Sequence, residues 1–394
     1  MPLAATGALL LILGAASVAS GLIPWPALAG LADRVGPILA FVAAITVVTE
    51  LLNAAGLFEW IASHFRRWGR GRVWALWMLV VGLSLAATVF LSLDTTAVLL
   101  TPIVVILARR CGLPPLPFAL TTVWLANTGS LLLPVSNLTN LLALHALGGV
   151  SPAEFAARMA LPALWCALLP AAAVALLFRR QLAGRYNTLR IGRLRADDET
   201  AVGTGPDPVL LGTGAVVLAL LLPALVSGVP VWIPAAAAAV VLVGVFAVRR
   251  RGVLRWALVP WQLLVFAAGL FVVMEALQHL GARELAGTLL GVGEGPGDLL
   301  RVAAAGAVGA NVVNNLPAYL AFEQAAGSPA RLAGLLVGVN AGPLVTPWAS
   351  LATLIWHEQL RRLGVAISWW GYAAAGIVLV PLLVVPAALL AAIP

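Results

Sequence analysis

The sequence has no lysine, only two cysteines, and few charged residues of any kind. Charged residues make up 10% of the 394 positions, against roughly 25% in an ordinary soluble domain. Hydrophobic residues make up 62%, a composition that excludes a water-soluble fold. Cys111 and Cys166 are too few for a disulfide framework and too far apart for a metal motif. We therefore expect no metal site and no cofactor.

Two motifs of hydrolytic enzymes are missing as well. The chain contains neither HExxH, which holds a catalytic zinc, nor GxSxG, which presents a serine nucleophile. No other nucleophile–base pair stands out in the sequence. We therefore expect a protein that is not an enzyme.

Long apolar windows are present instead. Met159–Phe178, Val209–Val226, Val231–Val248 and Ala373–Ile393 contain no charge, and about 20 apolar residues suffice to cross the ~30 Å hydrocarbon core of a bilayer. The sequence therefore predicts an all-α, multi-pass protein of the plasma (inner) membrane, with the lipid bilayer around it.

All 23 basic residues are arginine, and they give a net charge of +8. In a soluble protein such a charge would suggest nucleic-acid binding. Here the arginines gather in short loops, where they mark the cytoplasmic side, so no nucleic-acid partner is expected. The clusters are Arg66–Arg72, Arg109–Arg110, Arg179–Arg195, Arg249–Arg255 and Arg361–Arg362. With all five in the cytoplasm, the N-terminus lies inside and the C-terminus outside.

The first two clusters predict a re-entrant hairpin. Only 36 residues separate Arg72 from Arg109, too few for two spans of about 20 residues and a turn. A hairpin over 73–108, entering and leaving on the cytoplasmic side with its tip near 92–96, satisfies both limits. Along the whole chain the same rule predicts a second hairpin at 299–326 and about nine full spans. These spans lie at 4–23, 36–63, 116–147, 159–178, 209–226, 231–248, 260–290, 331–360 and 366–392.

An internal repeat supports this path. Asn127–Leu141 aligns without gaps on Asn340–Leu354, and the six identities among fifteen positions include Asn, Gly and Pro. The arginine pattern makes the two segments cross in opposite directions, which is the inverted-repeat plan of many secondary transporters. We predict a first repeat over 1–180, a cytoplasmic linker over 181–207 and a second repeat over 208–394. Each repeat has one hairpin and one broken helix, the latter at 116–147 and 331–360.

The repeated segments combine helix-breaking residues with hydroxyl and amide side chains. Because lipid satisfies no backbone polar group, an unwound stretch at membrane depth must line a cavity enclosed by protein. The alternative is that small and polar residues support close helix packing. On the first interpretation the substrate-binding residues, hairpin tips included, are Thr95, Thr96, Asn127, Thr128, Gly129, Ser130, Ser136, Asn137, Asn314, Asn315, Asn340, Gly342, Thr346, Ser350 and Thr353.

Carboxylates within apolar segments are the candidates for ion coupling. Asp94, at the first hairpin tip, is the first choice for carrying a proton or cation, with capping of a helix N-terminus as the alternative. Glu50 and Glu275 are further candidates. No arginine falls near the middle of a predicted span, so a polyanion would lack its usual guanidinium partner. The site therefore suits a neutral or weakly charged solute that bears oxygen.

At these positions the sequence resembles the ArsB-type arsenite permeases of the ion transporter superfamily, which are related to divalent-anion/sodium symporters. The resemblance covers residues 36 to 392, on the motifs Ala55–Trp60, Asp94-x7-Pro102-Ile-Val104, Val135–Asn140, Asn314–Pro317, Ser350–Leu354 and Ile367–Trp369. It places the hairpin carboxylate of the family on Asp94 and its paired asparagines on Asn314 and Asn315. The chain departs from the family pattern at Leu93 and Thr95, where Asn and Gly are common, and at Asn127, where we expect Asp.

The resemblance implies proton-linked efflux of arsenite or antimonite by alternating access. It also implies that the proton gradient supplies the energy, that the protein often forms a homodimer, and that an arsenite-stimulated ATPase subunit sometimes assists. A sodium/proton antiporter or a sodium-coupled anion transporter on the same fold is the alternative. Sodium dependence of transport would separate the two.

Overall fold

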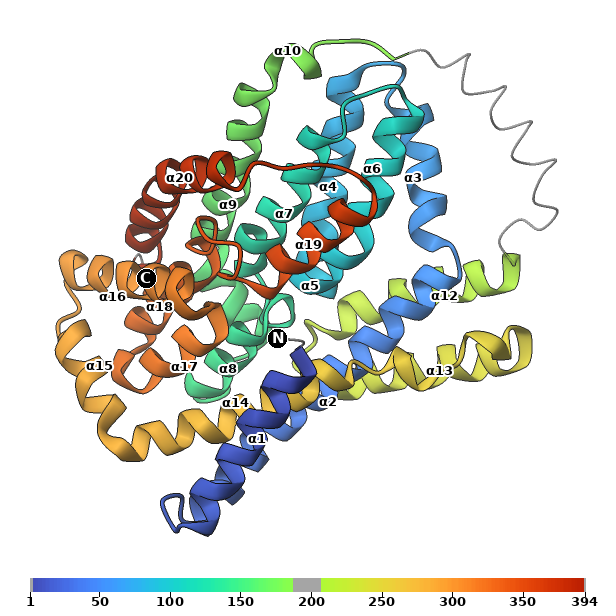
Figure 1. Cartoon of the computed structure of the whole chain (residues 1–394). Coiled ribbons are helices and arrows are strands. Elements are labelled where there is room, and N and C mark those ends of the chain that lie inside the picture. The colour runs from blue at the N-terminus through green and yellow to red at the C-terminus, as the bar shows by residue number, and fades with distance from the viewer. Residues whose placement is uncertain (1–2, 187–206, 393–394) are drawn as a thin grey trace.

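The computed structural model describes residues 3–186 and 207–392, and in these ranges helices joined by turns and loops make up the fold, without a β-strand (Figure 1). The all-α prediction is confirmed. Six helices in this part of the chain are long and apolar enough to cross a membrane. They are α2 (Trp25–Ala54), α4 (Val73–Leu91), α9 (Pro152–Leu177), α13 (Trp232–Arg249), the run from α14 (Trp261–Leu277) through α15 (Arg283–Leu290), and α20 (Trp369–Leu390).

These six helices differ from the nine predicted spans for two physical reasons. The apolar helices α1 (Leu3–Ala19) and α12 (Pro208–Ala224) have 17 residues each, and the predicted spans at 116–147 and 331–360 are interrupted by unwound backbone. In the other direction, α4 is apolar enough to span, but the chain reverses direction just after it. The number of crossings and the sides of the two termini stay predictions.

The helix expected at 36–63 has different bounds. α2 begins at Trp25, after the extended Pro24, and ends at Ala54. Gly56 then takes a left-handed φ of 81°, which glycine adopts at no steric cost, and α3 (Leu57–Trp68) follows as a separate helix. The predicted bounds are therefore wrong, and Asp33 and Arg34 lie inside a long helix rather than before it.

Two pairs of long helices form one part of the molecule, in which α1 packs along α14 and α2 along α13 (Figure 1). The first pair depends on glycine. A Cβ added to Gly7 would lie 2.8 Å from the backbone nitrogen of Phe266, and one added to Gly269 would lie 2.8 Å from that of Leu11. Small residues allow such close backbone approach between membrane helices.

Asp207 fixes the start of α12 at the arginine-rich end of α13. Its carboxylate accepts hydrogen bonds from the backbone nitrogen of Val209 at 2.9 Å and from Nε and Nη2 of Arg249, both at 3.1 Å. The hydrogen bond from Arg249 lowers the pKa of Asp207. Asp207 therefore stays ionised, and keeps its contact with Arg249, at a lower pH than an isolated aspartate would.

The two hairpins have the same outline. In the first, α4 is followed by α5 (Leu93–Thr95), a π-helical turn (Thr96–Leu100) and α6 (Thr101–Arg110); in the second, α16 (Pro296–Val313) is followed by α17 (Asn315–Ala326). The reversals occur at Ser92 and Asn314. Across the first, Thr88 Oγ1 donates to Thr96 Oγ1 at 3.0 Å.

A broken segment follows each hairpin. The first consists of α7 (Leu116–Thr128), two 3₁₀ turns (Gly129–Leu131 and Pro134–Ser136) and α8 (Leu138–Ala146), and the second of α18 (Pro329–Ala341) and α19 (Leu351–Arg362). Each is followed by a long helix, α9 or α20, and these two pack together. The remaining short helical elements are α10 (Arg179–Leu182), Arg251–Val253, Trp256–Leu258 and the π-helical Gln278–Ala282.

The order hairpin, broken segment, long helix therefore occurs in both halves, and the halves interlock. α5 and the π-helical turn of the first hairpin pack on α19, while α17 of the second hairpin packs on α8. The inverted orientation of the halves stays a prediction. Most of the predicted linker, at 187–206, lies outside the described residues.

Candidate functional site

Both hairpin tips carry the same unusual backbone. Ser92 has φ 100° and ψ 159°, and Asn314 has φ 118° and ψ 155°. A residue other than glycine held at positive φ costs on the order of 1–3 kcal/mol and persists only where its surroundings hold it. Ser92 Oγ accepts from the backbone nitrogen of Thr95 at 3.4 Å. Asn314 Oδ1 accepts from Leu316 N at 3.2 Å, and its Nδ2 donates to the carbonyl of Trp348 at 2.9 Å.

Asp94 lies in the helical turn directly after the first tip. Its side chain is half-buried, and its buried Oδ1 has no hydrogen-bond partner among the described residues. The capping role that sequence alone allowed Asp94 belongs instead to Ser92. A buried carboxylate oxygen without a partner is costly unless it is protonated or meets a ligand.

The broken segments meet through their amide side chains. Asn127 Nδ2 donates to Thr353 Oγ1 at 3.2 Å, and Asn340 Nδ2 donates to Asn140 Oδ1 at 2.7 Å. Asn127 aligns with Asn340 in the internal repeat, and Asn140 aligns with Thr353. Each segment therefore donates from its first residue to the fourteenth residue of the other. This exchange joins segments about 200 residues apart in the chain.

Asn340 is the centre of this buried network. Its Oδ1 also accepts from Asn137 Nδ2 at 2.7 Å and from Thr139 Oγ1 at 2.9 Å. Asn137 in turn caps α8 by accepting from Thr139 N, and the aligned Ser350 caps α19 in the same way. The unwound stretches therefore end at equivalent positions in the two copies.

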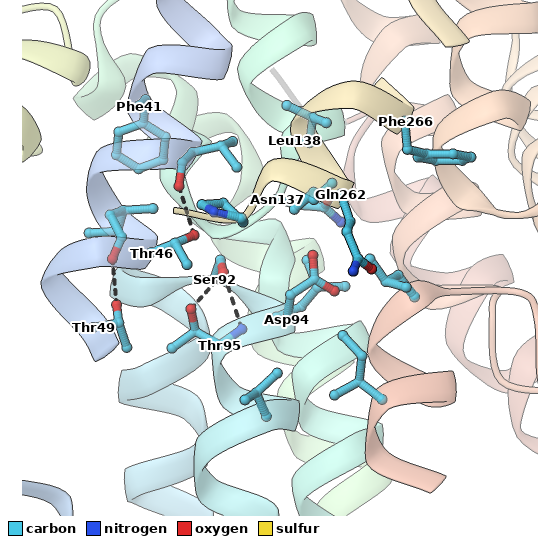
Figure 2. A pocket seen from close by; sticks show the side chains of 18 of the residues that line it. Phe41, Thr46, Thr49, Ser92, Asp94, Thr95, Asn137, Leu138, Gln262 and Phe266 are labelled. Carbon is cyan, nitrogen blue, oxygen red and sulfur yellow. Dashed lines mark hydrogen bonds between the residues drawn. The ribbon is translucent and has the colours of Figure 1, made fainter. Parts of the chain in front are cut away.

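A cavity of about 650 Å³ lies where the first tip, the second tip and the start of α8 meet α2 and the beginning of α14 (Figure 2). Asp94 and Gln262 both point into it in Figure 2. No arginine, lysine or histidine of the described chain lines it. Its polar wall consists of Thr46, Thr49, Glu50, Ser92, Asp94, Thr95, Asn137, Gln262, Asn314 and Asn315.

Comparison with known proteins places this architecture. The chain is 32% identical over 377 residues to the arsenical pump membrane protein of Escherichia coli K12, covering 89% of this chain and 85% of that protein. It is 32% identical over 375 residues to the arsenical pump membrane protein of Yersinia enterocolitica, covering 88% and 84%. Residues 1–351 match the citrate transporter family, CitMHS. This chain belongs to the ArsB/CitMHS family of membrane transporters.

Membership in the ArsB/CitMHS family makes the chain a multi-pass inner-membrane protein, as the apolar helices predict. A solved structure, that of the YdaH transporter of Alcanivorax borkumensis, described as having an unusual topology, superposes with a TM-score of 0.55. The superposition covers 99% of this chain and 97% of that one at 17% identity. At that identity the likeness concerns the fold alone.

Six of the predicted site residues of this ArsB/CitMHS protein are brought together. The substrate candidates Thr95, Asn137, Asn314 and Asn315 line the cavity, as do the coupling candidates Asp94 and Glu50. The third coupling candidate, Glu275, does not line it, and its Oε1 lies 3.6 Å from Nε2 of His279.

The other predicted substrate residues do not line the cavity, and several of them bond to other parts of the chain. Asn127, Asn340 and Thr353 bond across the two segments, and Ser130 Oγ donates to the carbonyl of Asn127 at 2.7 Å. Thr346 Oγ1 donates to the carbonyl of Asn311 at 2.8 Å. For these the packing alternative describes the observed contacts. The predicted residues that do not line the cavity are Thr96, Asn127, Thr128, Gly129, Ser130, Ser136, Asn340, Gly342, Thr346, Ser350 and Thr353.

Sequence reasoning missed one wall of the cavity. Thr46, Thr49 and Glu50 of α2 follow the spacing of three and four residues that places side chains on one helix face. This spacing is visible in the sequence, but only Glu50 was predicted as a site residue. Gln262, in the first turn of α14, had no counterpart in the repeat. Cys111 and Cys166 are buried and do not line the cavity.

Proposed function

We propose that this chain is a secondary active transporter that exports arsenite or antimonite in exchange for protons. One structural observation carries the proposal: the half-buried carboxylate of Asp94, whose buried Oδ1 has no hydrogen-bond partner among the described residues, lines a cavity that no arginine, lysine or histidine of the described chain lines. The names of its relatives point to the same class of solute.

Hydrogen bonding supplies the coupling. Trivalent arsenite is an uncharged hydroxide near neutral pH, so each of its O–H groups can donate to a carboxylate. In this proposal ionised Asp94 accepts such a bond, and the side-chain amides of Gln262 and Asn315, which line the same cavity, donate to the hydroxide oxygens. Protonated Asp94 is a poorer acceptor. The solute and the proton therefore bind in turn, which is the requirement for antiport.

Alternating access completes the proposal. The chain would consist of two inverted repeats, with the N-terminus in the cytoplasm, the C-terminus outside, and the cavity at the repeat interface. A homodimer and an ATPase subunit are further expectations from the family. Sodium in place of the proton is the rival form of coupling, with Asp94 as the sodium ligand.

Arsenite uptake into everted membrane vesicles tests this function. We expect uptake to rise when the interior of the vesicles is made more acidic than the medium. We expect it to be unchanged when sodium replaces potassium at constant pH. If the vesicles take up neither arsenite nor antimonite under any gradient, the substrate assignment is wrong. If uptake follows the sodium gradient alone, the proton assignment is wrong.

Citrate should not compete with arsenite, although the family is named for citrate transport. Asp94 and Glu50 both face the cavity, and adding a tricarboxylate there would place like charges together without a cationic partner. A large molar excess of citrate should leave arsenite uptake unchanged, whereas antimonite should inhibit it. Inhibition by citrate as strong as that by antimonite would refute the neutral-solute site.

A further inference from the structure

A second cavity, of about 520 Å³, lies next to the site just described and shares Leu141 with it. It is lined by the early turns of α2, the later turns of α8, the loop after α8 and the loop between α12 and α13. Asp33, Arg34 and His145 give it a charged and polar wall. Nothing in the proposed binding of arsenite uses this cavity.

The two cavities share the same face of α2. Arg34, Pro37 and Ile38 line the second cavity, and the first begins at the next turn with Phe41 and continues to Glu50. Spacings of three and four residues keep these side chains on one side of the helix. α2 therefore forms one continuous wall for both cavities.

α8 forms the facing wall in the same manner. Leu138 lines the first cavity, Leu144 and His145 line the second, and Leu141 lines both. Since α2 contacts α8, the cavities lie end to end along one helix interface.

The residues that line the two cavities also include ones near opposite ends of α13. The second cavity is lined by Trp232, the first residue of α13, and the first cavity by Ala257 and Val259, which follow the end of α13 at Arg249. An 18-residue helix spans about 27 Å, close to the thickness of the hydrocarbon core. The first cavity therefore lies towards the arginine-rich face and the second towards the opposite face.

Three apolar side chains form a layer where the two cavities meet: Ile38 lines the second, Phe41 lines the first and Leu141 lines both. Ile38, Phe41 and Leu141 are 7%, 1% and 5% exposed. With no polar group in this layer, a hydroxide crossing it would have to give up its hydrogen bonds, which is costly. The layer is therefore a barrier in the conformation observed.

A partly buried ion pair lies next to these residues, with its arginine 23% exposed and its glutamate 6% exposed. Arg34, one turn before Ile38, pairs with Glu323 of α17, which also accepts from Tyr319 OH at 3.0 Å. Removing one member of a buried pair leaves an uncompensated charge and is strongly destabilising to the arrangement that holds it. The pair ties the second hairpin to α2 in this conformation.

We propose that the two cavities are the two halves of one solute path, closed by Ile38, Phe41 and Leu141 and held closed by Arg34–Glu323. The second cavity is then where the small neutral hydroxide is released. This inference rests on the proposed function for the identity of the solute, but not for the existence of the path.

Cysteine labelling tests the path without any arsenite. Val42→Cys reports from the first cavity and Leu144→Cys from the second, each probed with a membrane-impermeant methanethiosulfonate applied to one face of the vesicle. Mass spectrometry locates the modified residue, so Cys111 and Cys166 stay in place. We expect residue 42 to react only from the arginine-rich face and residue 144 only from the other.

Opening the barrier should change this pattern. Added to Val42→Cys, either Leu141→Ala or Glu323→Gln should raise labelling of residue 42 from the far face by at least about tenfold, because each shifts the population towards the open form. Leu382→Ala, at a side chain 53% exposed, and Glu358→Gln, in an exposed ion pair, are the matched controls and should not.

Two results would overturn the path. One is labelling of residues 42 and 144 from the same face in the parent chain. The other is labelling of residue 42 from the arginine-rich face alone in both Leu141→Ala and Glu323→Gln. If the labelling is as expected but the protein does not transport arsenite, the assignment of the solute is wrong and the path between the cavities stands.

Discussion

Replacing Asp94 with asparagine should reduce arsenite uptake driven by a pH gradient at least about tenfold, to the level of vesicles without the protein. The amide keeps the shape of the side chain but cannot exchange a proton. Its Oδ1 has no hydrogen-bond partner among the described residues that the substitution would disturb, so the protein should fold normally. The measurement is initial uptake in everted vesicles, normalised to the amount of folded protein in the membrane.

The control for Asp94→Asn is Glu284→Gln, which neutralises an exposed carboxylate outside the cavity. It should transport at the rate of the parent chain. Full gradient-driven uptake by Asp94→Asn would remove the coupling role, and Glu50, on the same cavity wall, would be the next candidate.

The second large effect is expected at Asn340, where leucine should destabilise the protein by about 2–5 kcal/mol. The substitution removes three buried side-chain hydrogen bonds, to Asn137, Thr139 and Asn140, and such bonds in membrane proteins are worth roughly 0.6–1.7 kcal/mol each. Thermal unfolding in detergent should therefore shift to markedly lower temperature. Transport should fall as well, because Asn137 lines the cavity and is oriented by Asn340.

Thr353→Val is the graded control for Asn340→Leu, since it removes the equivalent contact to Asn127. We expect a smaller shift for Thr353→Val than for Asn340→Leu. Unfolding of Asn340→Leu at the temperature of the parent chain would show that the network contributes nothing to stability.

The reversal points and the two broken segments could be predicted from sequence. An asparagine, a glycine and a proline in register between 127–141 and 340–354 locate the broken segments, and the helix caps Asn137 and Ser350 fall at aligned positions. Such signals are local, because a cap or a proline acts on its own backbone.

The partners of the polar side chains could not be predicted. Asn127 and Asn340 were predicted as substrate ligands because their actual partners, Thr353 and Asn140, lie about 200 residues away in the chain and cannot be recognised from sequence. Inside a bilayer an amide in the protein interior needs a partner of some kind, and the sequence does not say whether that partner is a solute or another helix. For the same reason the sequence did not identify Gln262 or the α2 residues Thr46 and Thr49 as part of the cavity, because only the packing of the helices brings them there.

The predicted start of the helix at residue 36 was wrong for a simpler reason, since α2 begins at Trp25. Asp33 and Arg34 resemble the end of a loop, yet Arg34 is paired with Glu323 inside the fold. A paired charge is tolerated where an isolated one is not, so charge alone placed the helix boundary too late.

The central requirement of the proposed exchange is that Asp94 holds either a proton or the solute. Proton release on addition of arsenite to the purified, detergent-solubilised protein in weak buffer measures this directly. We expect the parent chain to release up to about one proton per cavity, by linkage between solute binding and protonation, and Asp94→Asn to release none. Arsenite binding without proton release by the parent chain, or equal release by Asp94→Asn, would contradict it.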